Sequence, residues 1–370
     1  MAPTQTAAQR KAHRETLRAV LRGEGELGRR FARVRAFSRT VRSSEYHITG
    51  ACNLRCKGCW FFAYDYDKKT GDLQSAESWR MFAKDQAQSR QITSALLIGG
   101  EPTLYPERVA AFVEWMDYVT ISSNGLRRLP NEGFENVGVA LTLFGGGALD
   151  DELRARRPSG GRFQGLFEKV LENYKNDHRV GFVYALVPKA ASEIEPTVRR
   201  IQDNGNTVSF NYYSDYEAED KLGEGCEARL LDEALRVKEL YPETVVNDRY
   251  YIRTLITGAT EWGEFGYDVC PSISVDHPAH GERLANGNPV LPGFNTYAAD
   301  GKTVNFCCTS GECEGCRDSQ AVYSWLLVSA QQFMRTESGL RTWLDIAEGY
   351  WSQFPWSPFH KSSAEAWREA

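Results

Sequence analysis

Residues 45–59 read EYHITGACNLRCKGC and join a predicted strand to three closely spaced cysteines. Polar and apolar side chains alternate at the start of this stretch, as they do in a half-buried β-strand. Cys52, Cys56 and Cys59 follow with the spacing C-x3-C-x2-C and without a fourth cysteine nearby. A structural zinc site and an ordinary electron-transfer [4Fe–4S] cluster both take four protein ligands. Three cysteines would leave one iron of a cluster with an open position, where chemistry can take place.

Two more motifs stand at the ends of predicted strands. The apolar run at residues 94–98 ends in Gly99-Gly100-Glu101-Pro102, and the run at 119–123 ends in Asn124-Gly125. Glycines let the backbone approach a ligand closely, and a carboxylate can accept hydrogen bonds from an ammonium group. The three motifs, in this order, resemble those of the radical S-adenosylmethionine (radical SAM) superfamily.

The resemblance implies a chemistry for the open iron. In that family it is chelated by the amino and carboxylate groups of S-adenosylmethionine (SAM), and reductive cleavage of SAM gives a 5′-deoxyadenosyl radical. It also implies that Gly99, Gly100 and Glu101 contact the SAM ammonium group. Ser123 and Asn124 would contact the ribose. A helix-capping role is the alternative for Glu101, and a plain turn is the alternative for Asn124.

A fourth family pattern concerns the SAM carboxylate. Residues 140–145, at the end of the fourth predicted strand (137–143), read ALTLFG, and residues 150–154 read DDELR. By resemblance, Thr142 and Arg154 would hold the carboxylate, which suits the planar fork of an arginine. The neighbouring Arg156 and Arg157 compete for this role, and a solvated basic turn is the alternative.

The chain departs from the family pattern at two positions. Many relatives carry an aspartate where this chain has Phe144, which we expect to reshape the substrate pocket. Relatives often place an aromatic residue just before the third cysteine, where this chain has Gly58, with Trp60 just after it. The adenine contact is therefore not assigned. Tyr213 and its neighbours near the sixth strand are interpreted as pocket wall.

A second cysteine set lies near the C-terminus and comprises Cys270, Cys307, Cys308, Cys313 and Cys316. This set resembles the auxiliary-cluster ("twitch" or SPASM-like) domain of radical SAM enzymes and implies one auxiliary [4Fe–4S] cluster. Its ligands would be Cys270, Cys307, Cys313 and Cys316, with Cys308 as the alternative to Cys307, because adjacent side chains on a strand point to opposite faces. A four-cysteine zinc site is the competing interpretation.

Composition and charge narrow the functional classes. The chain has 370 residues, of which 42% are hydrophobic and 25% charged, as in ordinary globular proteins. Residues 1–42 hold 11 Lys and Arg against 3 Asp and Glu, although the whole chain carries a net charge of −5. Helical spacing of apolar residues in this stretch predicts amphipathic helices docked on an acidic body. Nucleic-acid binding, a membrane span and a signal peptide are not expected, and the cysteine usage suggests a reducing cytoplasm.

Short apolar strands are predicted at about 45–49, 94–98, 118–123, 137–143, 179–187 and 206–213. They alternate with helical stretches at about 75–90, 105–116, 160–176 and 192–204, and two further helices are predicted over 217–240 and 322–333. This alternation predicts an α/β fold with a parallel sheet. The resemblance implies an open, partial (β/α)6 TIM-like barrel with a small C-terminal auxiliary iron–sulfur domain. We predict five regions: N-terminal amphipathic helices at 1–42, the partial barrel at 43–216, a helical linker at 217–260, the auxiliary domain at 261–318 and a helical tail at 319–370.

The sequence supports several reactions. The preferred hypothesis is hydrogen abstraction from a small-molecule substrate, followed by oxidation through the auxiliary cluster, with an external electron donor of the flavodoxin or ferredoxin type. A redox-neutral epimerase is an alternative, and Cys226 is then the candidate hydrogen donor; otherwise it is a small buried thiol. A maturase that modifies a precursor peptide is another alternative. An iron–sulfur electron carrier is the non-enzymatic one.

Overall fold

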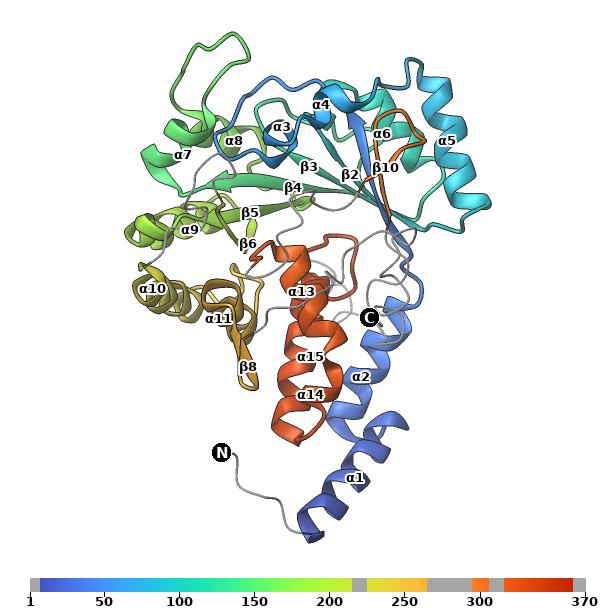
Figure 1. Ribbon diagram of the computed structural model, residues 1–370, viewed down its shortest axis with the longest axis vertical. Helices are drawn as coiled ribbons and strands as arrows, with labels where there is room; N and C mark the ends of the chain where they lie inside the picture. The colour runs from blue at the N-terminus through green and yellow to red at the C-terminus, as the bar shows by residue number, and fades with distance from the viewer. Residues whose placement is uncertain (1–6, 215–224, 265–294, 306–315, 362–370) are drawn as a thin grey trace.

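The computed structural model describes residues 7–214, 225–264, 295–305 and 316–361. In these residues one large sheet carries the order β10-β9-β1-β2-β3-β4-β5-β6, and a separate hairpin pairs β7 with β8 (Figure 1). The strands are β1 (Ser43–Thr49), β2 (Ser94–Gly99), β3 (Tyr118–Ser123), β4 (Val137–Phe144), β5 (Val180–Leu186), β6 (Thr207–Tyr212), β7 (Ala259–Thr260), β8 (Gly263–Glu264), β9 (Thr296–Tyr297) and β10 (Val304–Asn305).

The six strands from β1 to β6 are the predicted β/α units, and each pairs in parallel with the next. β9 adds a parallel strand beside β1, and β10 closes that edge in the antiparallel direction. The sheet is open, with β10 and β6 at its edges. The α/β class and the partial-barrel arrangement are confirmed. Residues 295–305 therefore extend the main sheet, while the domain boundary at 261 stays a prediction.

Helices connect the strands and cover the outer face of the sheet (Figure 1). Four predicted helical stretches correspond to α5, α6, α8 and α9. The helices are α1 (Ala7–Leu21), α2 (Gly25–Ser38), α3 (Trp60–Ala63), α4 (Tyr66–Lys69), α5 (Ala76–Gln88), α6 (Pro106–Val113), α7 (Gly147–Arg154), α8 (Leu166–Asn173), α9 (Ile194–Asp203), α10 (Glu227–Leu240), α11 (Arg249–Thr257), α13 (Ser319–Val328), α14 (Ala330–Phe333) and α15 (Glu337–Ser352), with 3₁₀ turns η1 (Pro102–Leu104) and η2 (Pro188–Glu193).

Two predicted helices differ in their limits. In the described residues the helix expected over 217–240 begins at Glu227, and Cys226 is its N-cap. The helix expected over 322–333 begins earlier, at Ser319, because Asp318 accepts hydrogen bonds from the main-chain N–H groups of Gln320 and Ala321. It is split into α13 and α14 at Ser329.

The two faces of the sheet have different side chains because strand residues alternate in direction. On β6, Val208 and Phe210 are buried against the outer layer. Thr207, Ser209 and Asn211 line a cavity on the inner face. The inner face is therefore polar and incompletely filled, and it is here that a ligand can enter.

The N- and C-terminal segments pack together below the sheet (Figure 1). Arg30 of α2 lies 2.6 Å from Asp345 and 2.8 Å from Glu348 of α15. Past α15 the chain reaches the inner face, where Trp356 donates its indole N–H to the Thr120 hydroxyl at 2.9 Å. The segment after α15 thus closes the cavity at the amino end of the strands. Among the described helices, none combines the length and the apolar character needed to cross a membrane.

Candidate active site at the carboxyl edge of the sheet

The cysteine loop follows β1 at the carboxyl edge of the sheet, which is where parallel β/α folds place their sites. Its backbone is fixed by hydrogen bonds to the end of α7 and the turn behind it. The Arg55 N–H donates to the Arg156 carbonyl at 2.8 Å, and the Lys57 N–H donates to the Leu153 carbonyl at 2.8 Å. The loop is therefore attached to a segment about a hundred residues further along the chain.

The three thiols of this loop line one cavity of about 460 Å³. Burial raises the pKa of Cys52 to about 11 and that of Cys56 to about 12, and it also raises the pKa of Cys59. In the described residues, no group of three or more His, Cys, Asp or Glu side chains is arranged to hold a single metal ion.

The turn after β2 packs directly on the cysteine loop. The Gly100 N–H donates to the Thr49 carbonyl at 2.7 Å, and a Cβ at Gly100 would lie only 2.0 Å from the Ala51 oxygen. Gly99 has φ +120°, and a Cβ there would lie 2.5 Å from the Thr49 oxygen. The close approach of these two backbones explains why both positions are glycine.

Glu101 joins the ends of β2 and β3. Its carboxylate is buried and accepts hydrogen bonds from the Thr103 N–H at 3.0 Å and from the Ser123 hydroxyl at 2.8 Å. Its second oxygen accepts from the Asn124 N–H at 2.8 Å. Burial raises the pKa of Glu101 despite these bonds. The capping role considered from the sequence is thus present, while Glu101 also lines the cavity; its contact with an ammonium group stays a prediction.

Asn124 links β3 to the cysteine loop. Its side-chain amide donates to the Asn53 side-chain oxygen at 2.7 Å and lies 3.9 Å from the Cys52 sulfur. Its side-chain oxygen accepts from the Leu126 N–H at 2.9 Å. The predicted ribose residues Ser123 and Asn124 therefore also organise the site, and both line the cavity.

Arg154 is buried at the end of α7 beside the cysteine loop. One guanidinium nitrogen lies 3.1 and 3.2 Å from the two carboxylate oxygens of Asp150, and the other donates to the Asn124 carbonyl at 3.0 Å. Although burial acts to lower it, the charge of Asp150 raises the pKa of Arg154, so the group stays cationic. The buried Nε has no hydrogen-bond partner among the described residues. Asp150, which sequence reasoning assigned no role, is the residue that orients this cation.

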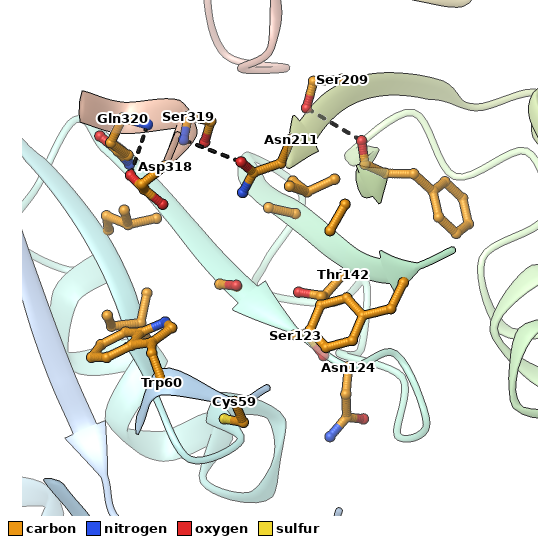
Figure 2. A pocket seen from close by; sticks show the side chains of 18 of the residues that line it. Cys59, Trp60, Ser123, Asn124, Thr142, Ser209, Asn211, Asp318, Ser319 and Gln320 are labelled. Carbon is orange, nitrogen blue, oxygen red and sulfur yellow. Dashed lines mark hydrogen bonds between the residues drawn. The ribbon is translucent and has the colours of Figure 1, made fainter. Parts of the chain in front are cut away.

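Apolar and aromatic side chains form the near wall of the cavity. Phe144 follows Thr142 on β4, and its ring packs edge-on against Tyr213 at 5.2 Å between centroids. Trp60 also lines the cavity, next to Cys59. Figure 2 shows Trp60 and Cys59 on one side and Thr142 with Asn124 on the other. The prediction that Tyr213 forms pocket wall is confirmed.

The far wall is polar and brings β6 next to the start of α13 (Figure 2). The Asn211 side-chain oxygen accepts hydrogen bonds from the main-chain N–H groups of Tyr212 at 2.7 Å and Ser319 at 3.1 Å. Asp318, Ser319 and Gln320 line this wall. Sequence reasoning missed the wall; the alternation of polar and apolar residues along β6 was the available signal.

The remaining predicted cysteines have different positions. Cys316 lines the cavity just before α13, whereas Cys226 is not among the described residues that line it. Cys226 is half-buried at the start of α10. Cys270, Cys307, Cys308 and Cys313 lie outside the described residues.

Three solved structures show a general likeness to this chain. The native form of anSMEcpe with bound AdoMet is 14% identical, with 63% of this chain and 70% of that chain covered and a TM-score of 0.43. Streptococcus suis SuiB bound to S-adenosylmethionine is 16% identical, with 62% and 57% covered and a TM-score of 0.41. Methylornithine synthase is 14% identical, with 86% and 92% covered and a TM-score of 0.39. These scores are too low to support an inference about activity.

The parallel sheet, the cavity at its carboxyl edge and the three-thiol loop define an open β/α-barrel domain with a candidate cofactor site at the ends of its strands. Residues 46–201 match the model of the radical SAM superfamily. That superfamily uses a [4Fe–4S] cluster and S-adenosylmethionine for radical chemistry.

Proposed function

We propose that this protein is a radical SAM enzyme that cleaves SAM reductively and abstracts hydrogen from a small-molecule substrate. The observation that carries the proposal is the meeting of Cys52, Cys56 and Cys59 with the Gly99–Glu101 turn and Arg154 around one cavity. A simple iron–sulfur electron carrier needs thiol ligands, but it does not need this turn or a buried arginine beside them. A cavity of this size falls in the usual range for sites that enclose a small ligand.

The residues present fit a [4Fe–4S] cluster and SAM. The three thiols would hold the cluster, which when reduced supplies the electron that breaks a C–S bond of SAM and yields the 5′-deoxyadenosyl radical. The turn at Gly99–Glu101 would take the ammonium group. Arg154 is a fixed cation with an unpartnered N–H beside Cys56, which favours a carboxylate there, with Thr142 facing the same space.

The substrate side of the cavity supports a compact, polar molecule. The side-chain oxygen of Asn211 accepts hydrogen bonds from two main-chain N–H groups, so the orientation of the amide is fixed before a ligand binds. The segment containing Trp356 closes the cavity at the other end. A space closed at this end, with one polar wall, favours a small metabolite over an extended peptide, which is the second substrate class we consider.

We further propose that the substrate is oxidised by two electrons. One hydrogen atom would go to 5′-deoxyadenosine, and the substrate radical would then lose one electron to an auxiliary [4Fe–4S] cluster and one proton to water. The proposed ligands are Cys270, Cys307 or Cys308, Cys313 and Cys316. Support comes from Cys316, which lies on the wall of the cavity.

The first experiment is anaerobic reconstitution with iron and sulfide, reduction with dithionite and addition of SAM. We expect 5′-deoxyadenosine from the wild-type protein and none from Cys56→Ala, with a two-cluster iron content in the wild type. Protein that binds a fully protein-ligated metal in the cysteine loop, or that never cleaves SAM, would overturn the proposal.

The epimerase alternative predicts a different result for a variant at Cys226. If it donates a hydrogen atom to the substrate radical, Cys226→Ala forms 5′-deoxyadenosine but no product. Its position outside the described cavity wall favours the oxidation, for which Cys226→Ala should turn over normally. Net reductant consumption without substrate oxidation would instead count against the oxidative route.

A further inference from the structure

Gly58 stands between the second and third cysteines of the loop with a left-handed backbone, φ +71°. A Cβ at this position would lie 2.8 Å from the Tyr213 hydroxyl oxygen and 2.8 Å from the Ser214 carbonyl oxygen. Both distances are shorter than a Cβ tolerates. The chain that leaves β6 therefore occupies the space that any side chain at position 58 would need.

Tyr213 is itself firmly placed. Its N–H donates to the Leu186 carbonyl at 3.0 Å, which continues the ladder between β5 and β6. Its ring belongs to a small apolar cluster with Leu153 and Ala185, against which Phe144 also packs. From this fixed position the Tyr213 hydroxyl donates to the Lys57 carbonyl at 3.3 Å.

The peptide that follows Cys56 is thus held from two sides. The Lys57 N–H donates to Leu153 at the end of α7, and the Lys57 carbonyl accepts from Tyr213 after β6. Ordering a loop residue costs conformational entropy when the fold does not fix that residue beforehand. Because the N–H and the carbonyl of Lys57 are both hydrogen-bonded already, the loop loses less conformational entropy when it adopts the geometry that a cluster needs.

We propose that Tyr213 is a positioning residue of the cluster site, which fixes Cys56 and Cys59 relative to each other before iron is bound. The inference rests on the proposed function, because it concerns the cluster that those cysteines would hold. Tyr213 acts through the loop backbone. Gly58 is the complementary part of the device, since only glycine lets the tyrosine hydroxyl approach.

The test compares Tyr213→Phe with Tyr184→Phe. Tyr184 is a matched control because its buried hydroxyl also donates to a main-chain carbonyl, that of Gly145 at 2.8 Å, away from the cysteine loop. Each reconstituted protein is challenged anaerobically with excess ferrous chelator, and loss of the visible cluster absorbance is followed. Losing one hydrogen bond that holds the loop predicts release about 3- to 10-fold faster for Tyr213→Phe and unchanged release for the control.

Two further readouts separate positioning from general stability. The iron-free forms of both variants should unfold at similar temperatures, and only Tyr213→Phe should change the electron paramagnetic resonance spectrum of the reduced cluster. Gly58→Ala should take up less iron than Gly161→Ala, whose added Cβ meets nothing within 4 Å.

Equal release rates for the two tyrosine variants, with equal spectra, would overturn the role of Tyr213 while leaving the proposed function intact. Wild-type protein that assembles no cluster would overturn both.

Discussion

Replacing Gly100 with alanine tests the packing of the β2 turn on the cysteine loop. The added Cβ would lie 2.0 Å from the Ala51 oxygen and 2.5 Å from the Ala51 carbonyl carbon, distances that real Cβ atoms do not show. One of the two backbones must therefore move by about 1 Å to restore a contact of 3 Å. The Gly50 carbonyl carbon would lie 3.0 Å from the same Cβ, so the new methyl group meets the backbone of two successive residues.

The effect on the unfolding free energy follows from the hydrogen bonds that the displacement strains. The displacement strains the hydrogen bonds from Gly100 to Thr49 at 2.7 Å and from Glu101 to Ala51 at 2.8 Å. Each is worth roughly 0.5–1.5 kcal/mol, and overpacking adds about 1–3 kcal/mol. We therefore expect a loss of about 2–6 kcal/mol in unfolding free energy. Because Ala51 directly precedes Cys52, the Cys52 thiol moves too. Metal–ligand distances vary by only about 0.2 Å, so a displacement of this size disturbs a metal site.

The assay measures chemical denaturation of the iron-free protein and the iron and sulfide bound after anaerobic reconstitution. Gly71→Ala is the control, since a Cβ there meets nothing within 4 Å and the backbone is not left-handed. Gly100→Ala should be destabilised and should bind markedly less iron than the control. If the two variants unfold alike and load iron alike, the close approach described here is not what positions the loop.

Three other changes have defined outcomes. Asp150→Asn keeps an acceptor for the Phe144 N–H but leaves the Arg154 cation buried without its charge partner. This change should lower the unfolding free energy by about 3–5 kcal/mol in denaturant titrations. It should also weaken SAM binding. Trp356→Phe removes one hydrogen bond and should lower the unfolding free energy by about 1 kcal/mol, with unchanged iron content. Burial raises the pKa of Asp248 to about 7. Between roughly pH 4 and 7 the unfolded chain therefore releases a proton that the folded chain keeps. The unfolding free energy consequently falls as pH rises through this range. Asp248→Asn, which can still cap α11, should match the wild type near pH 4 and exceed it by about 4 kcal/mol at pH 8, since one pKa unit corresponds to about 1.4 kcal/mol; equal pH profiles would refute this.

The sequence alone determined the positions of the six parallel strands and of the cysteine loop. Strand alternation and turn residues mark all six parallel strands to within a residue or two at each end, because local hydrophobic periodicity reports the burial of each face. The motif at Cys52–Cys59 needs no tertiary information, since its three cysteines lie within eight consecutive residues. These local signals led to the resemblance to the radical SAM superfamily, whose model matches residues 46–201.

Tertiary structure alone decided which distant residues complete the site. Asp150 orients Arg154, and Tyr213 reaches the loop carbonyl of Lys57 across 156 residues of sequence. No local pattern encodes such contacts, because they depend on how the ends of α7 and β6 converge on the loop. The polar wall at Asn211 and the closure by Trp356 likewise arise only when β6, α13 and the segment after α15 are packed around one space.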